Sequence, residues 1–304
     1  MEQRDFRQFR QSRIQLFSRL KLRSFFPGEW ESIYTGGGIE FTSTKPFEPG
    51  DDLRDLDFLT LVQSGEEEII QRVVESQMRV LIWADVSGSI QKFEGMFFPL
   101  KPEIRDIALG LIVYSALNAY SPVGLCAFDE EIRCFIPARS GEGHCEEILN
   151  WIIDQEYKGI KVAADIQRAI SFLMKKAPPQ SLVFFISDFQ DQVFEGDFTN
   201  LLKTAAKKVD FIPVVIRDPL EKEAFLKRSV NVHVKNNEGD GRAEIYLTPQ
   251  RLKHIQEVSA SRLLNLEKNF HKVGIDYAIL DSSSIDDCYK ILSGFFEVRK
   301  RTRV

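Results

Sequence analysis

Two continuous apolar runs stand out in the pattern of hydrophobic and polar positions along the chain, and each of them ends in an aspartate. The first begins near Met78 and reads through LIWA to Asp85, and the second, SLVFFIS at residues 181–187, ends at Asp188. Apolar runs without polar alternation are typical of strands that are buried on both faces of a parallel sheet. The pattern therefore predicts two central strands, each with a carboxylate at its carboxyl end.

The rest of the chain alternates between helical and strand patterns. Helices are predicted over residues 104–120, 145–155, 165–176, 199–208, 249–273 and 285–299. Further strands are predicted over residues 123–128, 132–136, 211–216, 230–234, 243–247 and 275–280. Strands that alternate with helices imply an α/β fold with a doubly wound, mostly parallel sheet, and the close spacing of residues 123–128 and 132–136 adds an antiparallel hairpin.

The region before the first central strand, residues 1–75, is predicted to be an N-terminal extension that packs on a main body formed by residues 76–304. Residues 2–26 have the basic and apolar positions of an amphipathic helix. Such a helix packs on its own domain or, as the alternative, lies on a membrane or clasps a partner.

An acidic turn follows Pro49 and Gly50 in this extension. Its charged residues are Asp51, Asp52, Arg54, Asp55 and Asp57. We expect Arg54 to pair with these carboxylates and the turn to lock the extension onto the main sheet. The loss of one partner of a buried ion pair costs roughly 3 to 5 kcal/mol, so Arg54→Ala would then lower the melting temperature.

The loop after the first central strand carries three oxygen ligands, because Asp85 is followed by Ser87 and Ser89. In an open α/β sheet, ligands bind at the carboxyl ends of the strands, where the loops converge, and Asp188 is expected at the same edge. Carboxylate and hydroxyl oxygens suit Mg²⁺, Mn²⁺ or Ca²⁺. We therefore expect a weak Mg²⁺ or Mn²⁺ site, with a simple turn bonded to its own backbone as the alternative.

The order D-x-S-x-S after one strand, with an aspartate after a later strand, resembles the metal-ion-dependent adhesion site of von Willebrand factor A domains. The resemblance implies a von Willebrand A-type fold and a metal site made of Asp85, Ser87, Ser89 and Asp188. A loop that supplies a threonine ligand in that family reads KGIKVAADIQRAI here, with Ala164 before Asp165. Asp165 is a candidate substitute ligand and also a candidate N-cap of the next helix.

Two further segments precede this site, GGIEF at residues 37–41 and FEPGDDLRDLDF at residues 47–58. The ordered set resembles the bacterial and archaeal family catalogued as domain of unknown function fifty-eight, in which similar segments precede a von Willebrand A-type domain. Phe58 stands where that family usually has tryptophan, and the likeness continues through IRDPLE at residues 216–221 to the final helix. The resemblance implies a protein-binding module that acts with a MoxR-type AAA+ ATPase in chaperone-like assembly or maturation of a client.

Composition narrows the class of protein. The chain has 304 residues with 43% hydrophobic content, enough for a substantial core, and its net charge of −5 gives no general attraction to nucleic acid. The basic tail from Arg299 onward is expected to be solvated. The sequence shows neither the roughly 20 apolar residues of a membrane span nor a signal peptide, so a cytoplasmic location is expected. Its four cysteines lack C-x-x-C spacing and are predicted to be free thiols.

The main enzymatic alternative is a divalent-metal-dependent phosphohydrolase that uses Asp85 and Asp188, because metal ions at strand ends can activate water. Such an enzyme also needs a base or nucleophile and a group that stabilises developing charge. Around the two aspartates the sequence supplies Ser87, Ser89, Lys92, Gln190 and Asp191. This neighbourhood contains no histidine and no arginine. A non-catalytic binding module with a degenerate metal site is therefore the preferred interpretation.

Overall fold

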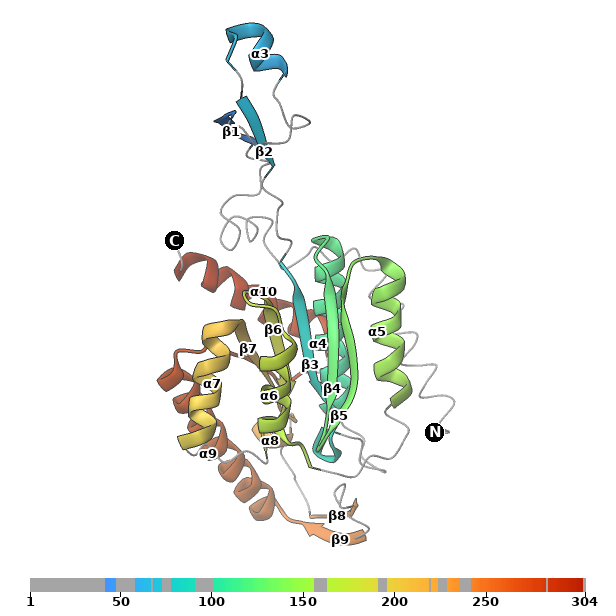
Figure 1. The fold of residues 1–304 in the computed structure, drawn as a ribbon. Coiled ribbons are helices and arrows are strands. Elements are labelled where there is room, and N and C mark those ends of the chain that lie inside the picture. Colours follow the sequence, from blue (N-terminus) through green and yellow to red (C-terminus); the bar gives the residue numbers. More distant parts are fainter. Residues whose placement is uncertain are drawn as a thin grey trace. The chain divides into compact units, whose positions relative to one another are not determined.

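The computed structural model describes the chain in segments (Figure 1). They are residues 42–47, 58–66, 68–72, 78–90, 101–155, 163–190, 196–218, 220–223, 229–235, 242–282 and 284–302. The chain divides near Met78 into a small unit and a large one. The predicted helix at residues 2–26, the GGIEF segment and the acidic turn of Asp51, Asp52, Arg54 and Asp57 lie outside the described residues.

The small unit contains an antiparallel pair of strands and one helix. Strand β1 (Thr42–Pro46) pairs with β2 (Glu68–Arg72), and helix α3 (Phe58–Ser64) lies between them in the chain. Gly65 follows the helix with a φ of 77°, a conformation that costs glycine little, and its N–H donates to the carbonyl of Leu61. The packing of this unit on the main body stays a prediction.

A six-stranded sheet forms the centre of the large unit, in the order β10-β7-β6-β3-β4-β5. Its strands are β3 (Val80–Asp85), β4 (Val123–Phe128), β5 (Ile132–Arg139), β6 (Leu182–Ser187), β7 (Asp210–Ile216) and β10 (Ala278–Leu280). All neighbouring pairs are parallel except β4 with β5. The chain starts at the centre with β3, winds outward to β5, returns to β6 beside β3 and winds outward again. This order confirms the predicted doubly wound fold with an antiparallel hairpin.

Helices cover both faces of this sheet (Figure 1). They are α4 (Lys101–Asn118), α5 (Glu142–Gln155), α6 (Ile166–Lys176), α7 (Gly196–Lys208), α9 (Pro249–Val273) and α10 (Ile285–Thr302), with a one-turn helix α8 (Leu220–Glu223) before α9. Helix α4 contacts α5 and α10, whereas α7 contacts α6 and α9. The central strands are therefore shielded on both sides, which explains why their sequences are apolar at every position.

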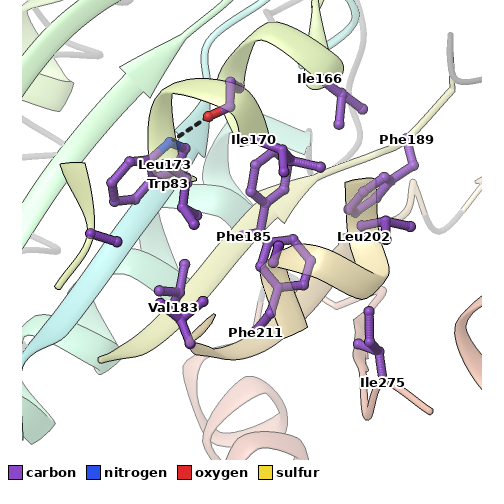
Figure 2. Close-up of a cluster of buried hydrophobic side chains, with 14 of the residues drawn as sticks. Trp83, Ile166, Ile170, Leu173, Val183, Phe185, Phe189, Leu202, Phe211 and Ile275 are labelled. Carbon is purple, nitrogen blue, oxygen red and sulfur yellow. Dashed lines mark hydrogen bonds between the residues drawn. The ribbon is translucent and has the colours of Figure 1, made fainter. Parts of the chain in front are cut away.

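Trp83 and most of the fully buried phenylalanines gather between the sheet and helices α6, α7 and α9 (Figure 2). Trp83 is fully buried, and its indole N–H donates to the carbonyl of Ala169 at 3.2 Å. The ring of Phe185 lies 5.0 Å from that of Phe128 and 5.4 Å from that of Phe211, between centroids. These contacts tie β3, β4, β6 and β7 to α6 and so fix the strand ends relative to one another.

Helix α9 has the bounds that the sequence predicts. Thr248 caps its first turn by accepting from the N–H of Arg251, and Pro249 occupies the first turn, where its missing N–H costs nothing. A hairpin of β8 (Val230–Lys235) and β9 (Arg242–Leu247) precedes it. Gly274 ends it with a φ of 73°.

Two predictions about the C-terminal region are wrong. The strand predicted over residues 275–280 is shorter, because the N–H of Ile275 donates to the carbonyl of Phe270 and completes the end of α9. Arg299 is not solvated, since α10 continues to Thr302 and the Arg299 side chain is buried in an ion pair with Asp210.

The structure also bears on the cysteines and on the possibility of a membrane-spanning helix. The four cysteines are free thiols, as predicted. None of the described helices combines the length and the apolar character needed to cross a membrane.

Candidate functional site

The carboxyl ends of β3 and β6 lie side by side, at the point where the strand order reverses. The two strands are parallel and in register, with Ala84 opposite Ile186, so Asp85 and Asp188 leave the sheet at the same edge. Across its other side, Asp85 is opposite Phe128 at the end of β4. Ligand sites of doubly wound sheets lie at this reversal point.

Asp85 is fully buried, and both of its carboxylate oxygens accept hydrogen bonds from neutral groups. The backbone N–H of Ser87 donates to Oδ1 at 2.9 Å, and the hydroxyl of Ser187 donates to Oδ2 at 2.6 Å. The second bond joins the two strand ends directly, because Ser187 precedes Asp188. In the described part of the chain no lysine, arginine or histidine pairs with the Asp85 carboxylate.

Burial and, second to it, the nearby charge of Asp188 raise the pKa of Asp85 to about 7, against hydrogen bonds from Ser187 and Ser87 that lower it. The effect of the Asp188 charge on Asp85 places the two carboxyl groups in one electrostatic site. At neutral pH the Asp85 carboxyl is thus divided between its protonated and ionised forms. Any cation that approaches it would favour the ionised form.

Asp188 differs from Asp85 because it has a cation of its own. Its Oδ2 lies 2.9 Å from the ammonium of Lys101, the first residue of α4, and its Oδ1 accepts from the N–H of Gln190 at 3.2 Å. The same ammonium lies 3.1 Å from Oε1 of Glu221. Although burial by itself lowers the pKa of Lys101, the carboxylates of Asp188 and Glu221 raise it, so this lysine stays charged.

Glu221 connects this edge of the sheet to helices α8 and α9. Its Oε1 accepts from the side-chain amide of Gln190 at 3.1 Å, and its Oε2 accepts from the hydroxyl of Ser259 at 2.9 Å. Arg217, which follows β7, places its Nε 3.7 Å from Oε2 of Glu221 and donates to the Ser259 hydroxyl. The two carboxylates of this network are balanced by the two cations.

The remaining predicted ligands are placed as follows. Ser87 is buried beside Asp85, and Ser89 belongs to the short helix η2 (Gly88–Ile90), where the structure describes its backbone alone. Asp165 caps α6: its carboxylate accepts from the N–H of Arg168 at 2.8 Å. Its own N–H donates to the carbonyl of Asp129, so the loop before α6 lies at the end of β4.

Asp85, Ser87 and Asp188 therefore gather at one place, with oxygen ligands of the kind that a hard divalent cation prefers. Over the described ranges, no group of three or more His, Cys, Asp or Glu side chains is arranged to hold a metal ion. An ion at this edge would depend on serine hydroxyls as well as the two aspartates, and the ammonium of Lys101 would oppose it. This donor set fits a weak metal site.

Sequence reasoning missed several residues of this edge, among them Asp129, Lys101 and Glu221. Asp129 is buried after β4 and pairs with Arg133, with 2.6 Å between Oδ2 and Nε. Asp129 directly follows the apolar run VGLCAF, and an aspartate after such a run is the same sequence signal that identified Asp85. Lys101 and Glu221 come from distant segments and carry no such signal.

The sequence around the two aspartates contains no arginine, but the structure brings one to Asp85 from helix α4. Arg105 on α4 is buried and donates to the carbonyl oxygen of Asp85 at 3.4 Å, while its Nε and Nη2 donate to Asp106. Sequence distance concealed it, because α4 contacts β3 in space. Lys92 and Asp191 lie outside the described residues.

A family model described as protein of unknown function DUF58 matches residues 43–261. Uncharacterized protein Rv1480 of Mycobacterium tuberculosis (strain ATCC 25618 / H37Rv) is 21% identical over 213 residues, which are 69% of this chain and 65% of the relative. The chain thus spans less than two thirds of the length of that relative.

Solved structures provide more distant likenesses. The conserved hypothetical protein BatB from Bacteroides thetaiotaomicron is 15% identical with a TM-score of 0.42, and the match covers 74% of this chain and 99% of that one. Proximal thread matrix protein 1 from the mussel byssus, in a structure with a zinc occupied MIDAS motif, is 14% identical with a TM-score of 0.37. That match covers 73% of this chain and 48% of the other. Such likenesses say nothing about function.

Proposed function

Because the chain belongs to the DUF58 family of proteins of unknown function, and because Asp85 and Asp188 meet at one edge of its sheet, we propose that it is a non-catalytic protein-binding module. Its binding face is the carboxyl edge of β3 and β6, with a degenerate metal-ion-dependent adhesion site. Asp85, Ser87, Ser89 and Asp188 would hold a Mg²⁺ or Mn²⁺ ion there. A carboxylate of the partner would complete the coordination of that ion.

The observation that carries this proposal is the bond between the two strand ends, from the Ser187 hydroxyl to the Asp85 carboxylate at 2.6 Å. It brings a carboxyl group without a described cationic partner next to a second carboxylate. The raised pKa of Asp85, at about 7, is the electrostatic result of that arrangement, with burial as its largest cause. A buried carboxylate that lies beside a second carboxylate and has no described cationic partner is suited to binding a cation.

The partner we propose is a MoxR-type AAA+ ATPase, with which the chain would assemble or mature a client protein. The resemblance of the GGIEF, PGDD and D-x-S-x-S segments to the family supports this choice. The cytoplasm is the proposed location, because an ATP-driven partner works where ATP is available.

The contacts of Lys101 and Arg105, two cations that the structure describes at this edge, favour binding over phosphate-ester hydrolysis. Lys101 is held between Asp188 and Glu221, and Arg105 is held by Asp106 and the Asp85 carbonyl. A phosphohydrolase would need such a cation to face the transferring phosphoryl group. In this structure the cations of the edge neutralise the protein's own groups instead.

Calorimetric titration with Mn²⁺ tests the metal site. We expect weak binding by the wild type, loss of binding in Asp85→Ala, and binding about tenfold tighter in Lys101→Met, because that variant removes a positive charge beside Asp188. Lys101→Arg keeps the charge and is the matched control. Identical titrations of the wild type and Asp85→Ala would remove the metal ion from the proposal.

Capture of a purified MoxR-type ATPase on the immobilised chain tests the partner. We expect capture in Mg²⁺ that Asp85→Ala and EDTA both weaken. Capture that neither treatment affects would leave a binding module without a metal face. Mg²⁺-dependent hydrolysis of p-nitrophenyl phosphate that is lost in Asp85→Ala would instead establish the enzymatic alternative.

A further inference from the structure

A groove of about 1040 Å³ runs along helix α9 and reaches the carboxyl ends of β6 and β7. At the sheet it begins at Asp188 and Gln190, and along α9 its lining extends from His254 to Asn269. At 1.5 Å of rise per residue, this stretch of helix is roughly 22 Å long. The groove therefore has the length of a bound peptide segment, well beyond that of a compact metabolite.

The α9 wall of this groove contains an apolar strip that is in part open to solvent. Ile255 and Val258 line it with 47% and 39% of their surface exposed, and Leu263 and Leu266 line it deeper in the structure. These four side chains follow helical spacing, which places them along one side of α9. Contiguous exposed apolar side chains of this kind are typical of protein-binding surfaces.

The charges along the groove are unequal at its two sides. At the sheet, the carboxylates of Asp188 and Glu221 are paired with Lys101 and Arg217. Along α9, the lining includes the exposed side chains of His254, Arg262 and Lys268. Among the hydrogen bonds and ion pairs of the described residues, none involves the side chains of these three. Arg262 and Lys268 thus give the groove a rim of positive charge that the carboxylates of its lining do not balance.

We propose that this groove binds an acidic amphipathic segment of a partner protein, laid along α9 with apolar side chains against Ile255 and Val258. Its carboxylates would pair with Arg262 and Lys268 at the rim. An amphipathic helix in an apolar groove is a recurring mode of peptide recognition, and the charges select an acidic one. This inference goes beyond the proposed function, because the α9 groove needs neither a metal ion nor the Asp85 carboxylate.

Fluorescence anisotropy with a labelled synthetic peptide tests the groove. The probe is about 16 residues long, the length of α9 along the groove, with leucine at helical spacing and glutamate elsewhere, and a matched peptide carries lysine in place of glutamate. We expect saturable binding of the acidic peptide and binding of the lysine peptide that is about tenfold weaker or absent. Absence of saturable binding by the acidic peptide, or equal binding of the two, would overturn the proposal.

Surface variants locate the binding. Arg262→Glu and Val258→Ser are each expected to weaken the acidic peptide about tenfold, whereas Lys253→Glu, an exposed charge reversal on α9 outside the groove lining, is expected to leave it unchanged. Unchanged melting temperatures would show that the variants are folded. Sensitivity to Arg262→Glu without sensitivity to Val258→Ser would indicate a bare charge patch and overturn the groove.

The two proposals are separable with one further variant. Asp85→Ala is expected to abolish Mn²⁺ binding while leaving the affinity for the acidic peptide unchanged. Loss of peptide binding in this variant, with its fold intact, would assign the peptide to the carboxyl edge and overturn the α9 groove.

Discussion

An aspartate lies at each end of the central sheet, fully buried at one end (Asp85) and with a side chain that is 9% exposed at the other (Asp210), and the two carboxylates have opposite kinds of partner. At the amino end, Asp210 of β7 accepts two hydrogen bonds from Arg299 of α10, with 2.6 Å from Nη2 to Oδ1 and 3.2 Å from Nη1 to Oδ2. Arg299 also donates from Nε to Asp276 at 2.8 Å. At the carboxyl end, Asp85 is bonded to a backbone amide and a serine hydroxyl.

This difference separates a structural ion pair from a candidate site. The guanidinium of Arg299 matches the Asp210 carboxylate with two parallel bonds, so the charge is balanced within the fold and α10 is fixed to the sheet. The neutral donors at Asp85 satisfy its hydrogen bonds but not its charge, and burial raises its pKa to about 7. The negative charge of the ionised Asp85 carboxylate is therefore not balanced by its described partners, and a metal ion or a cationic group of a partner protein can balance it.

The largest expected effect lies at the structural end. Arg299→Met removes the guanidinium from the Asp210 carboxylate, whose side chain is only 9% exposed, and the free energy of unfolding is expected to fall by about 3 to 5 kcal/mol, measured by chemical denaturation. The double variant Arg299→Met with Asp210→Asn removes both charges and is expected to recover part of the loss. If Arg299→Met alone is as stable as the wild type, the contrast between the two ends is wrong.

The second prediction concerns pH and the candidate site. The folded pKa of Asp85, about 7, is above its ordinary value of 3.8, so between these values the folded state holds a proton that the unfolded state has released. Stability is therefore expected to fall as pH rises from about 4 to about 7, by roughly 4 kcal/mol for a shift of this size, and then to level off.

Asp85→Asn cannot ionise and tests this prediction. We expect it to match the wild type near pH 4 and to be more stable than the wild type near pH 8, in denaturation curves measured across that range. Mg²⁺ is expected to narrow the difference at high pH by stabilising the ionised form in the wild type. If the difference in stability between Asp85→Asn and the wild type does not vary with pH, the pKa of Asp85 is not raised in the folded state.

The convergence of Asp85 and Asp188 could be predicted from sequence because the geometry of a parallel sheet requires it. Two apolar runs that end in aspartate must place those aspartates at one edge when their strands are parallel neighbours. The same regularity explains why α9 was predicted with its true bounds, since Thr248, Pro249 and Gly274 are local signals. Sequence is most informative where structure depends on neighbouring residues.

The charges around the site could not be predicted in the same way. Lys101 reaches Asp188 across 87 residues of sequence, and Glu221 joins them through a one-turn helix. No local pattern encodes which strand end a lysine on another element will face. Arg299 shows the same limit at the other end, because it looks like part of a basic tail until α10 packs it against Asp210.

The smallest expected effect decides the role of Asp165, whose carboxylate accepts from the N–H of Arg168 at the start of α6. Loss of an N-cap acceptor costs about 1 kcal/mol, so Asp165→Ala is expected to be less stable than the wild type by about that amount. Asp165→Ser keeps a capping oxygen without the charge and is expected to recover most of the loss. Denaturation curves measure both variants.

Calorimetric Mn²⁺ titration of the same two variants separates the cap from the ligand. Because the Asp165 side chain is exposed and engaged with the helix, we expect both variants to bind Mn²⁺ as the wild type does. Asp165→Ser that is stable but binds Mn²⁺ more weakly would show that Asp165 replaces the threonine expected where Ala164 stands. The carboxyl edge would then extend from β3 and β6 to the start of α6, and its contrast with the closed ion pair at Asp210 would be sharper.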